Sequence, residues 1–328
     1  MAQPHGRRVL SGIQPSGKLH LGNYFGALRQ YIELQDRGEE PFYFVANYHA
    51  LTSIQDREQL RRNTWDVVLD MLALGLDPER ATIFLQSDVP EVCELTWLLS
   101  VVTPLSLLEK AHSYKDKLAR GLAPNHGLFA YPVLMAADIL AYDSEIVPVG
   151  QDQKQHLEIT RDLAQRFNQA FGREVFALPD AYIVESTAVV PGVDGQKMSK
   201  SYGNTIELFL PEKALRKRVS AIVTDSTPVE APKDPEACNV YALLRLFLDD
   251  EQAADWAQRY RAGGLGYGEV KQALAEAILA AFAPARERRR KLEADPDTVR
   301  DVLRDGAARA REIAARTVAR ARDAAGIV

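Results

Sequence analysis

The chain has 328 residues, 46% of them hydrophobic and 26% charged, with a formal net charge of -5. This composition is ordinary for a globular protein of one or two domains, and the acidic balance argues against a protein that coats nucleic acid indiscriminately. No apolar run approaches the ~20 residues that cross a bilayer, so we expect neither a membrane span nor a signal peptide. The two cysteines, Cys93 and Cys238, have no metal-ligand spacing. We expect both to be buried thiols of a reduced, cytoplasmic protein.

The first half of the chain alternates between strand-like and helix-like segments. Short apolar runs predict strands at residues 8–12, 42–45, 81–86 and 146–149. Helical spacing of apolar residues predicts helices at residues 23–36, 57–76, 91–119, 131–142 and 155–171. This order predicts an α/β fold of the Rossmann-like kind, a doubly wound parallel sheet that binds ligands at the carboxyl ends of its strands.

The second half of the chain is predicted to be helical. Helices are expected at residues 211–219, 240–249, 251–260, 267–293 and 296–323. We therefore expect a catalytic domain over residues 1–205, a helical domain over 206–295, and a C-terminal helix over 296–328 that could pack back on the first domain. Between Arg286 and Arg322 there are twelve Lys and Arg residues against seven Asp and Glu residues. Either a solvated helix face or a surface that meets RNA would explain this excess.

The most specific segment is Lys197-Met198-Ser199-Lys200-Ser201. A given five-residue string occurs by chance in about one in ten thousand chains of this length. Two lysines among small and flexible residues make a cationic loop that suits a triphosphate. The plainer alternative is a solvated surface loop. We call residues 197–201 the lysine loop.

A second motif, residues 14–23, joins the first strand to the first helix, and we call it the histidine loop. Its glycines Gly17 and Gly22 allow a ligand to approach the backbone closely. His20 and Asn23 would share one face at the start of a helix, where free N–H groups attract phosphate. A glycine-containing loop with a capping residue is the structural alternative, and the pairing with the lysine loop favours phosphate chemistry.

These two loops resemble those of class I aminoacyl-tRNA synthetases. His20-Leu21-Gly22-Asn23 is similar to their HIGH motif, and the lysine loop matches their KMSKS motif letter for letter. Asn23, in place of a second histidine, is typical of the tryptophan- and tyrosine-specific branch. The resemblance extends over essentially the whole chain and implies that residues 206–295 bind the tRNA anticodon. It also implies catalytic roles for His20, Asn23, Lys197 and Lys200, and ATP contacts from Gln14, Pro15, Ser16, Gly22, Asn23, Lys197, Met198, Ser199, Lys200 and Ser201.

The choice of amino acid depends on the segment at residues 131–140. Tyr131, Met135 and Asp138 fall on one face of a helix, where an aromatic ring and a thioether can flank a large ring. Indole offers one N–H donor and no acceptor, which suits a carboxylate. An amphipathic helix with Tyr131 and Met135 in the core is the alternative. The segment is similar to that of bacterial tryptophan-specific synthetases, whose matching aspartate binds the indole nitrogen, whereas a tyrosine-specific enzyme would be expected to have Gln in place of Met135.

Further site residues follow from the same resemblance. It implies that Gly150, Gln151 and Asp152 contact the ATP ribose and that Gln153 contacts the ammonium of the amino acid, although Asp152 could simply cap a helix. Gln151 departs from the acidic residue often found there. Val189 corresponds to a backbone contact with adenine, and Lys117 to a lysine near the phosphates or to an exposed helix lysine. The remaining expected tryptophan contacts are Gly12, Gln14, His49, Val147 and Val149, of which His49 could equally be structural.

The expected enzyme is a tryptophan–tRNA ligase. Its substrates would be ATP, bound with Mg²⁺, together with L-tryptophan and tRNA(Trp), and the resemblance implies a homodimer without a dedicated metal site. A tyrosine-specific synthetase remains an alternative. So do a nucleotidylyltransferase that makes a small metabolite, which would lack the long helical half, and an inactive paralogue, against which Lys197 and Lys200 argue.

Overall fold

The computed structural model describes residues 6–110, 125–149, 154–183 and 189–327. Its centre is a parallel sheet of five strands in the order β3-β2-β1-β4-β5. The strands are β1 (Arg8–Ile13), β2 (Glu40–Val45), β3 (Thr82–Leu85), β4 (Ile146–Val149) and β5 (Asp180–Ile183). The predicted Rossmann-like fold is confirmed. The strand order reverses direction between β1 and β4, and ligands of such sheets bind beside that point.

Strand β5 was not predicted from the sequence. It is only four residues long and begins with the charged Asp180, so it lacks the apolar run by which the other strands were recognised. It pairs in parallel with β4, from Asp180 beside Ile146 to Ile183 beside Val149.

Helices surround the sheet. The first helical run is continuous through α1 (Leu21–Asn23), a π-helical turn (Tyr24–Leu28) and α2 (Arg29–Asp36). The following helices are α3 (Asn47–Ala50), α4 (Arg57–Leu74), a 3-10 turn (Gln86–Asp88), α5 (Glu91–Ser100), α6 (Leu105–Glu109), α8 (His126–Ala141) and α9 (Lys154–Phe171).

Two predictions in this region were wrong. The single helix expected at 91–119 is interrupted, because α5 ends at Ser100 and α6 begins only after Pro104, whose ring cannot continue a helix from the residues before it. Residues 111–119 lie outside the described residues. The expectation of two buried thiols holds for Cys238 alone, since Cys93 on α5 is exposed.

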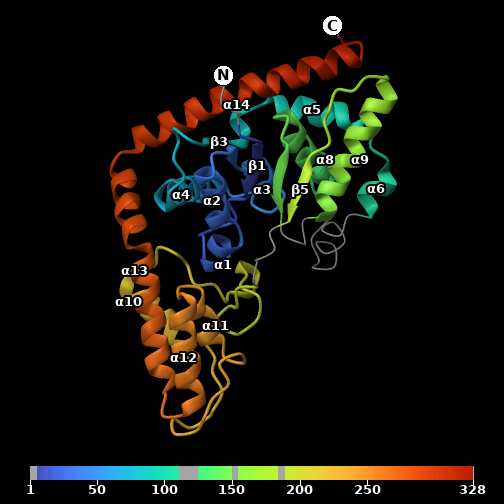
Figure 1. The fold of residues 1–328 in the computed structure, drawn as a ribbon. Coiled ribbons are helices and arrows are strands. Elements are labelled where there is room, and N and C mark those ends of the chain that lie inside the picture. The colour runs from blue at the N-terminus through green and yellow to red at the C-terminus, as the bar shows by residue number, and fades with distance from the viewer. Residues whose placement is uncertain (1–5, 111–124, 150–153, 184–188, 328) are drawn as a thin grey trace.

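Past the lysine loop the described chain continues as helices. After a 3-10 turn (Lys200–Tyr202) come α10 (Glu212–Ser220), α11 (Asn239–Arg245), α12 (Asp250–Ala262), α13 (Tyr267–Ala294) and α14 (Pro296–Ala324). Helix α11 is shorter than predicted, because Asp249 lies beyond its end and caps α12 by accepting the N–H of Gln252. Figure 1 shows α10, α11 and α12 gathered below the sheet, with α13 leading from them back to it.

Helix α14 returns along the sheet and packs on β3, α5 and α8 (Figure 1). Its small residues allow a close approach, and at Gly306 a Cβ atom would come within 1.9 Å of the carbonyl oxygen of Ile83. Ala310, Ile313 and Ala314 of α14 are buried in the same core as Phe84. The last helix is therefore part of the core that supports the sheet.

The basic residues at the C-terminal end serve this packing. Each arginine between Arg286 and Arg322 has a partner within the chain. Several bind the half of the chain that contains the sheet: Arg288 donates to the carbonyl of Ala73, Arg311 pairs with Glu91, and Arg322 pairs with Glu94. Exposed ion pairs each stabilise little. Among the described residues, Arg300, Arg304 and Arg316 form ion pairs only within α14 and stay more than half exposed, so both explanations of the basic excess remain open for them.

In the described part of the chain, no helix is both long and apolar enough to cross a membrane.

Candidate active site

A cavity of about 1070 Å³ lies at the carboxyl ends of β1, β2 and β4. Most of the residues singled out from the sequence line it: Gly12, Gln14, Ser16, His20, Gly22, Asn23, His49, Tyr131, Met135, Asp138, Val147, Val189, Lys197, Met198, Ser199, Lys200 and Ser201. Pro15 is buried and does not line the cavity. Val149 ends β4. Lys117, Gly150, Gln151, Asp152 and Gln153 lie outside the described residues.

The histidine loop and the lysine loop touch one another. Lys200 Nζ donates to the carbonyl of Gly17 at 2.9 Å and lies 3.2 Å from Ser16 Oγ. Gly17 has a φ of 125°, a backbone conformation that favours glycine. The backbone N–H of Gly22 lies 3.4 Å from the sulfur of Met198. The two motifs, far apart in sequence, thus face the same space.

Backbone pairing holds the two motifs in register. The N–H of Leu21 donates to the carbonyl of Ile206 at 3.0 Å, and the N–H of Leu208 donates to the carbonyl of Leu19 at 3.0 Å. His20 lies opposite Glu207 in the same antiparallel pairing. The segment that follows the lysine loop is therefore fixed to the histidine loop.

Asn204 organises the lysine loop from within. Its Oδ1 accepts the N–H of Ser199 at 2.7 Å, and its Nδ2 donates to the carbonyl of Lys197 at 3.1 Å and to Asp194 at 2.8 Å. The residue is only 1% exposed. It was not among the sequence-predicted site residues. Its signal was its place directly after Gly203, since asparagine commonly bonds to nearby backbone in turns.

On the cationic side of the cavity, the pKa values of two groups, His20 and Lys200, are lowered. Burial, with a smaller contribution from the charge of Lys200, lowers the pKa of His20 to about 4. Burial also lowers the pKa of Lys200 to about 8, although Glu207 opposes this shift. His20 is therefore neutral at pH 7, and within the described residues its buried Nδ1 has no hydrogen-bond partner. An incoming anion would restore full charge to Lys200 and could bond to the imidazole.

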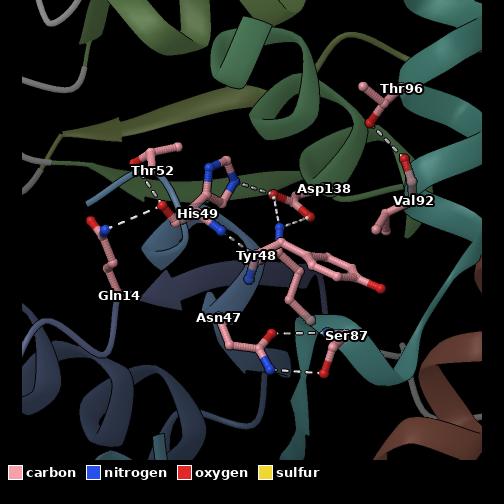
Figure 2. A network of polar contacts seen from close by, with 10 residues as sticks. Gln14, Asn47, Tyr48, His49, Thr52, Ser87, Val92, Thr96 and Asp138 are labelled. Carbon is pink, nitrogen blue, oxygen red and sulfur yellow. Dashed lines mark hydrogen bonds and ion pairs between the residues drawn. The ribbon is translucent and has the colours of Figure 1, made fainter. Parts of the chain in front are cut away.

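The opposite side of the cavity is formed by α8. Tyr131, Met135 and Asp138 all reach the cavity, as their helical spacing predicted. Asp138 is 1% exposed, and its Oδ2 lies 2.7 Å from Nε2 of His49. Figure 2 shows these two side chains pointing toward each other. Both of its carboxylate oxygens also accept from Nε2 of Gln86 at 2.9 Å. The carboxylate is thus buried, hydrogen-bonded and open to the cavity.

Two residues on this side of the cavity were not predicted from the sequence. Gln86 directly follows β3, and the rule that polar side chains emerge at the carboxyl ends of strands could have found it. His156 on α9 lines the cavity, and its Nε2 lies 3.1 Å from the hydroxyl of Tyr131. Burial raises the pKa of Tyr131 to about 12, so its hydroxyl stays protonated.

In the described part of the chain, no group of three or more His, Cys, Asp or Glu side chains could hold a metal ion. The cavity as described therefore combines a cationic side, suited to phosphates, with a buried acceptor beside an aromatic ring and a thioether.

Comparisons with known proteins agree with this chemistry. The family described as tRNA synthetases class I (W and Y) matches residues 4–283. The chain is 58% identical to the tryptophan–tRNA ligase of Rhodopirellula baltica over 98% of this chain and 99% of that protein. It is 54% identical to the tryptophan–tRNA ligase of Fusobacterium nucleatum, over 98% of each chain.

A solved structure shows the same architecture. The tryptophanyl-tRNA synthetase of Campylobacter jejuni, complexed with ADP and tryptophan, has a TM-score of 0.91 and 51% sequence identity to this chain, and the match covers 97% of this chain and 99% of that one. Taken with the family match, this likeness over the full length shows that the chain belongs to the class I tRNA synthetases of the tryptophan and tyrosine type.

Proposed function

We propose that the chain is a tryptophan–tRNA ligase. It activates L-tryptophan with ATP to tryptophanyl-adenylate and pyrophosphate, and then esterifies the amino acid to the 2′-hydroxyl of the terminal adenosine of tRNA(Trp). The observation that carries this proposal is one cavity that contains both the lysine loop and the buried carboxylate of Asp138. The full-length likeness to tryptophan–tRNA ligases supports it.

Tryptophan would lie against α8. Asp138, an acceptor, would take the indole N–H, while Met135 and Tyr131 flank the ring. Gln153 would bind the ammonium group. The rest of the proposed tryptophan pocket consists of Gly12, Gln14, His49, Val147 and Val149.

ATP would lie between the two loops. The tryptophan carboxylate attacks the α-phosphate, and because this nucleophile is already ionised, no general base is needed. Catalysis then consists of positioning and of stabilising the charge that develops on the departing pyrophosphate. His20 would act as a neutral hydrogen-bonding group beside Asn23, and Lys197 and Lys200 as the cations. The further ATP contacts would be Gln14, Ser16, Gly22, Gly150, Gln151, Asp152, Val189, Met198, Ser199, Ser201 and Lys117. The buried Pro15, which does not line the cavity, is not among them.

Mg²⁺ would enter with the nucleotide. Since the described residues offer no acidic cluster, the phosphates themselves would hold the ion. When bound, it neutralises phosphate charge, and the lysine loop provides the part of the charge stabilisation that belongs to the protein.

The tRNA would bind across the two parts of the chain. We assign the catalytic domain to residues 1–205, the anticodon-binding domain to residues 206–295 and a C-terminal helix to residues 296–328, in an enzyme that works in the cytoplasm.

We also infer a homodimer. Trp97, Val101 and Leu105 on and beside α5 and α6 are 69%, 59% and 68% exposed, and a cluster of large apolar side chains left in water is typical of an interface. Sedimentation analysis should give twice the chain mass, and Trp97→Glu should shift the protein towards the monomer. A monomeric wild-type protein would contradict this inference.

The decisive experiment is ATP–pyrophosphate exchange with each of the twenty amino acids. Exchange that depends on tryptophan alone supports the proposal, and exchange with tyrosine would overturn it. Charging of tRNA(Trp) then separates a ligase from an enzyme that makes only a nucleotide-linked metabolite.

A further inference from the structure

Gln86 lies directly behind the carboxylate of Asp138 and is fully buried, with 0% exposure. Its amide connects two elements. On one side Nε2 donates to Oδ1 and Oδ2 of Asp138, at 2.9 Å in each case. On the other side Oε1 accepts the backbone N–H groups of Tyr48 and His49 at 3.0 and 3.4 Å. Gln86 thus joins α3 to α8 through one side chain.

These contacts leave the amide of Gln86 only one orientation. Backbone N–H groups can only donate, so the amide oxygen must face Tyr48 and His49. An ionised carboxylate can only accept, so the amide nitrogen must face Asp138. The reversed amide would bring donor against donor on one side and acceptor against acceptor on the other. The direction of this hydrogen bond is therefore set by the backbone of α3.

The same arrangement fixes the carboxylate. Both oxygens of Asp138 accept from the amide of Gln86, and Oδ2 lies 2.7 Å from the ring nitrogen Nε2 of His49. Figure 2 shows the contact between His49 and Asp138. Donors on two sides hold the plane of the group and so fix the direction in which its oxygens accept. An ionised carboxylate offers about four lone-pair positions, so it can still accept one more donor from the cavity.

We propose that Gln86 is a positioning residue that sets the preference for tryptophan, by holding Asp138 as an acceptor aimed at the indole N–H. This inference rests on the proposed function, in which Asp138 binds the indole. Without the amide of Gln86, the carboxyl group can rotate away from this direction, and the indole N–H then loses its aligned acceptor. The site then loses its means of rejecting a ring without an N–H group.

The test compares two substrates that differ in that one group. ATP–pyrophosphate exchange is measured with L-tryptophan and with β-(3-benzothienyl)-L-alanine, in which sulfur replaces the indole N–H. In Gln86→Leu we expect the ratio of kcat/KM for tryptophan over the analogue to fall about tenfold or more, through a higher KM for tryptophan. If Gln86 only supports the fold, its loss would lower kcat/KM equally for both substrates and leave the ratio unchanged. That result would overturn the inference.

Gln86→Glu covers the case in which the leucine variant does not fold. It keeps the shape of the side chain but places a second carboxyl group against Asp138, so the ratio should fall here as well. A ratio equal to that of the wild type in a folded Gln86→Glu protein would also overturn the inference.

Gln35 provides a matched control. It is another buried glutamine, 3% exposed, and it lies outside the cavity. Its Oε1 accepts the N–H of Asp77 at 2.8 Å and its Nε2 donates to the carbonyl of Gly75 at 3.3 Å. Gln35→Leu should lower the melting temperature without changing the substrate ratio. A change in the ratio of similar size would show that loss of any buried amide has this effect, and the inference would fail.

Asp138→Ala, which removes the acceptor, separates the role of Gln86 from that of Asp138. If the ratio collapses in this variant but not in the Gln86 variants, Asp138 binds the indole and the role of Gln86 is wrong. If the ratio is unchanged in Asp138→Ala, the placement of the indole in the proposed function is itself wrong.

Discussion

The two sides of the cavity differ in how their polar groups are satisfied. On the side proposed for the amino acid, Asp138 is buried and already receives hydrogen bonds from His49 and Gln86. On the side proposed for the nucleotide, His20 has a buried nitrogen without a partner among the described residues, and the pKa of Lys200 is lowered to about 8. The acceptor on the first side is already held in position before a ligand binds, as selection of one substrate requires. The second has interactions left to make, as stabilisation of a transition state requires.

Among the substitutions that test this comparison, Asp138→Ala has the largest expected effect. The change removes the acceptor of the amino-acid side and leaves His49 and Gln86 without their common partner. We expect the preference for tryptophan over phenylalanine to fall by about 10³-fold, because sites that hydrogen-bond a substrate group reject analogues without that group by such factors. The measurement is kcat/KM in pyrophosphate exchange for both amino acids. An unchanged preference would remove Asp138 from the tryptophan site.

The counterpart on the nucleotide side is Lys200→Ala. Loss of one group that stabilises developing charge should slow adenylate formation about 10²-fold. Affinity for tryptophan, followed by equilibrium dialysis, should change little, because the side chain of Lys200 donates its hydrogen bonds to the histidine loop and not to α8 among the described residues. Equal losses in rate and in tryptophan affinity would show that the two sides are not separate in function.

The pH dependence of activity tests whether the charge of Lys200 contributes to the use of ATP. The pKa of Lys200 is lowered from 10.5 to about 8, so the free enzyme loses this charge as the pH rises through 8. We expect kcat/KM for ATP to decline above that pH, by up to about tenfold per pH unit. Lys200→Arg stays charged throughout and should abolish the decline, even if its maximal rate is lower. The same decline in the arginine variant would assign it to another group.

The smallest expected effect belongs to Asn204→Ala. Without Asn204 the backbone groups of Lys197 and Ser199 lose the contacts that shape the lysine loop. Adenylate formation should slow by roughly five- to tenfold, in line with the loss of one or two neutral hydrogen bonds. Single-turnover kinetics would measure this step. Asn168→Ala is a suitable comparison, since Asn168 also bonds to nearby backbone, near Val175 and Phe176, but lies outside the cavity.

The sequence predicted those features of the site that depend on local patterns of residues. The lysine and histidine loops are continuous motifs, and Tyr131, Met135 and Asp138 share a helix face, so each could be found without knowledge of tertiary contacts. Prediction from the sequence failed where the role of a residue depends on neighbours that are distant along the chain. Gln86 is a single glutamine whose partner Asp138 lies 52 residues further along the chain.

The basic C-terminal stretch shows the same limit. A run of arginines does not reveal whether it faces solvent, RNA or the protein itself. The answer depends on where α14 docks, and that depends on core residues such as Ala310 and Ile313. Strand β5 and the exposure of Cys93 were missed for related reasons, because a short strand and a helix face acquire their surroundings only in the folded chain.

The docking of α14 on β3 has a consequence for biosynthesis. Strand β3 lies at one edge of the sheet and is made early, whereas α14, which packs on it, is translated after all the other described elements. While the protein is still on the ribosome, the face of Ile83 and Phe84 that receives Gly306 and Ala310 lacks this cover. The half of the chain that contains the sheet can therefore complete its core only after α14 has been made, so a chain that stops before α14 would have the histidine and lysine loops but an incompletely covered sheet.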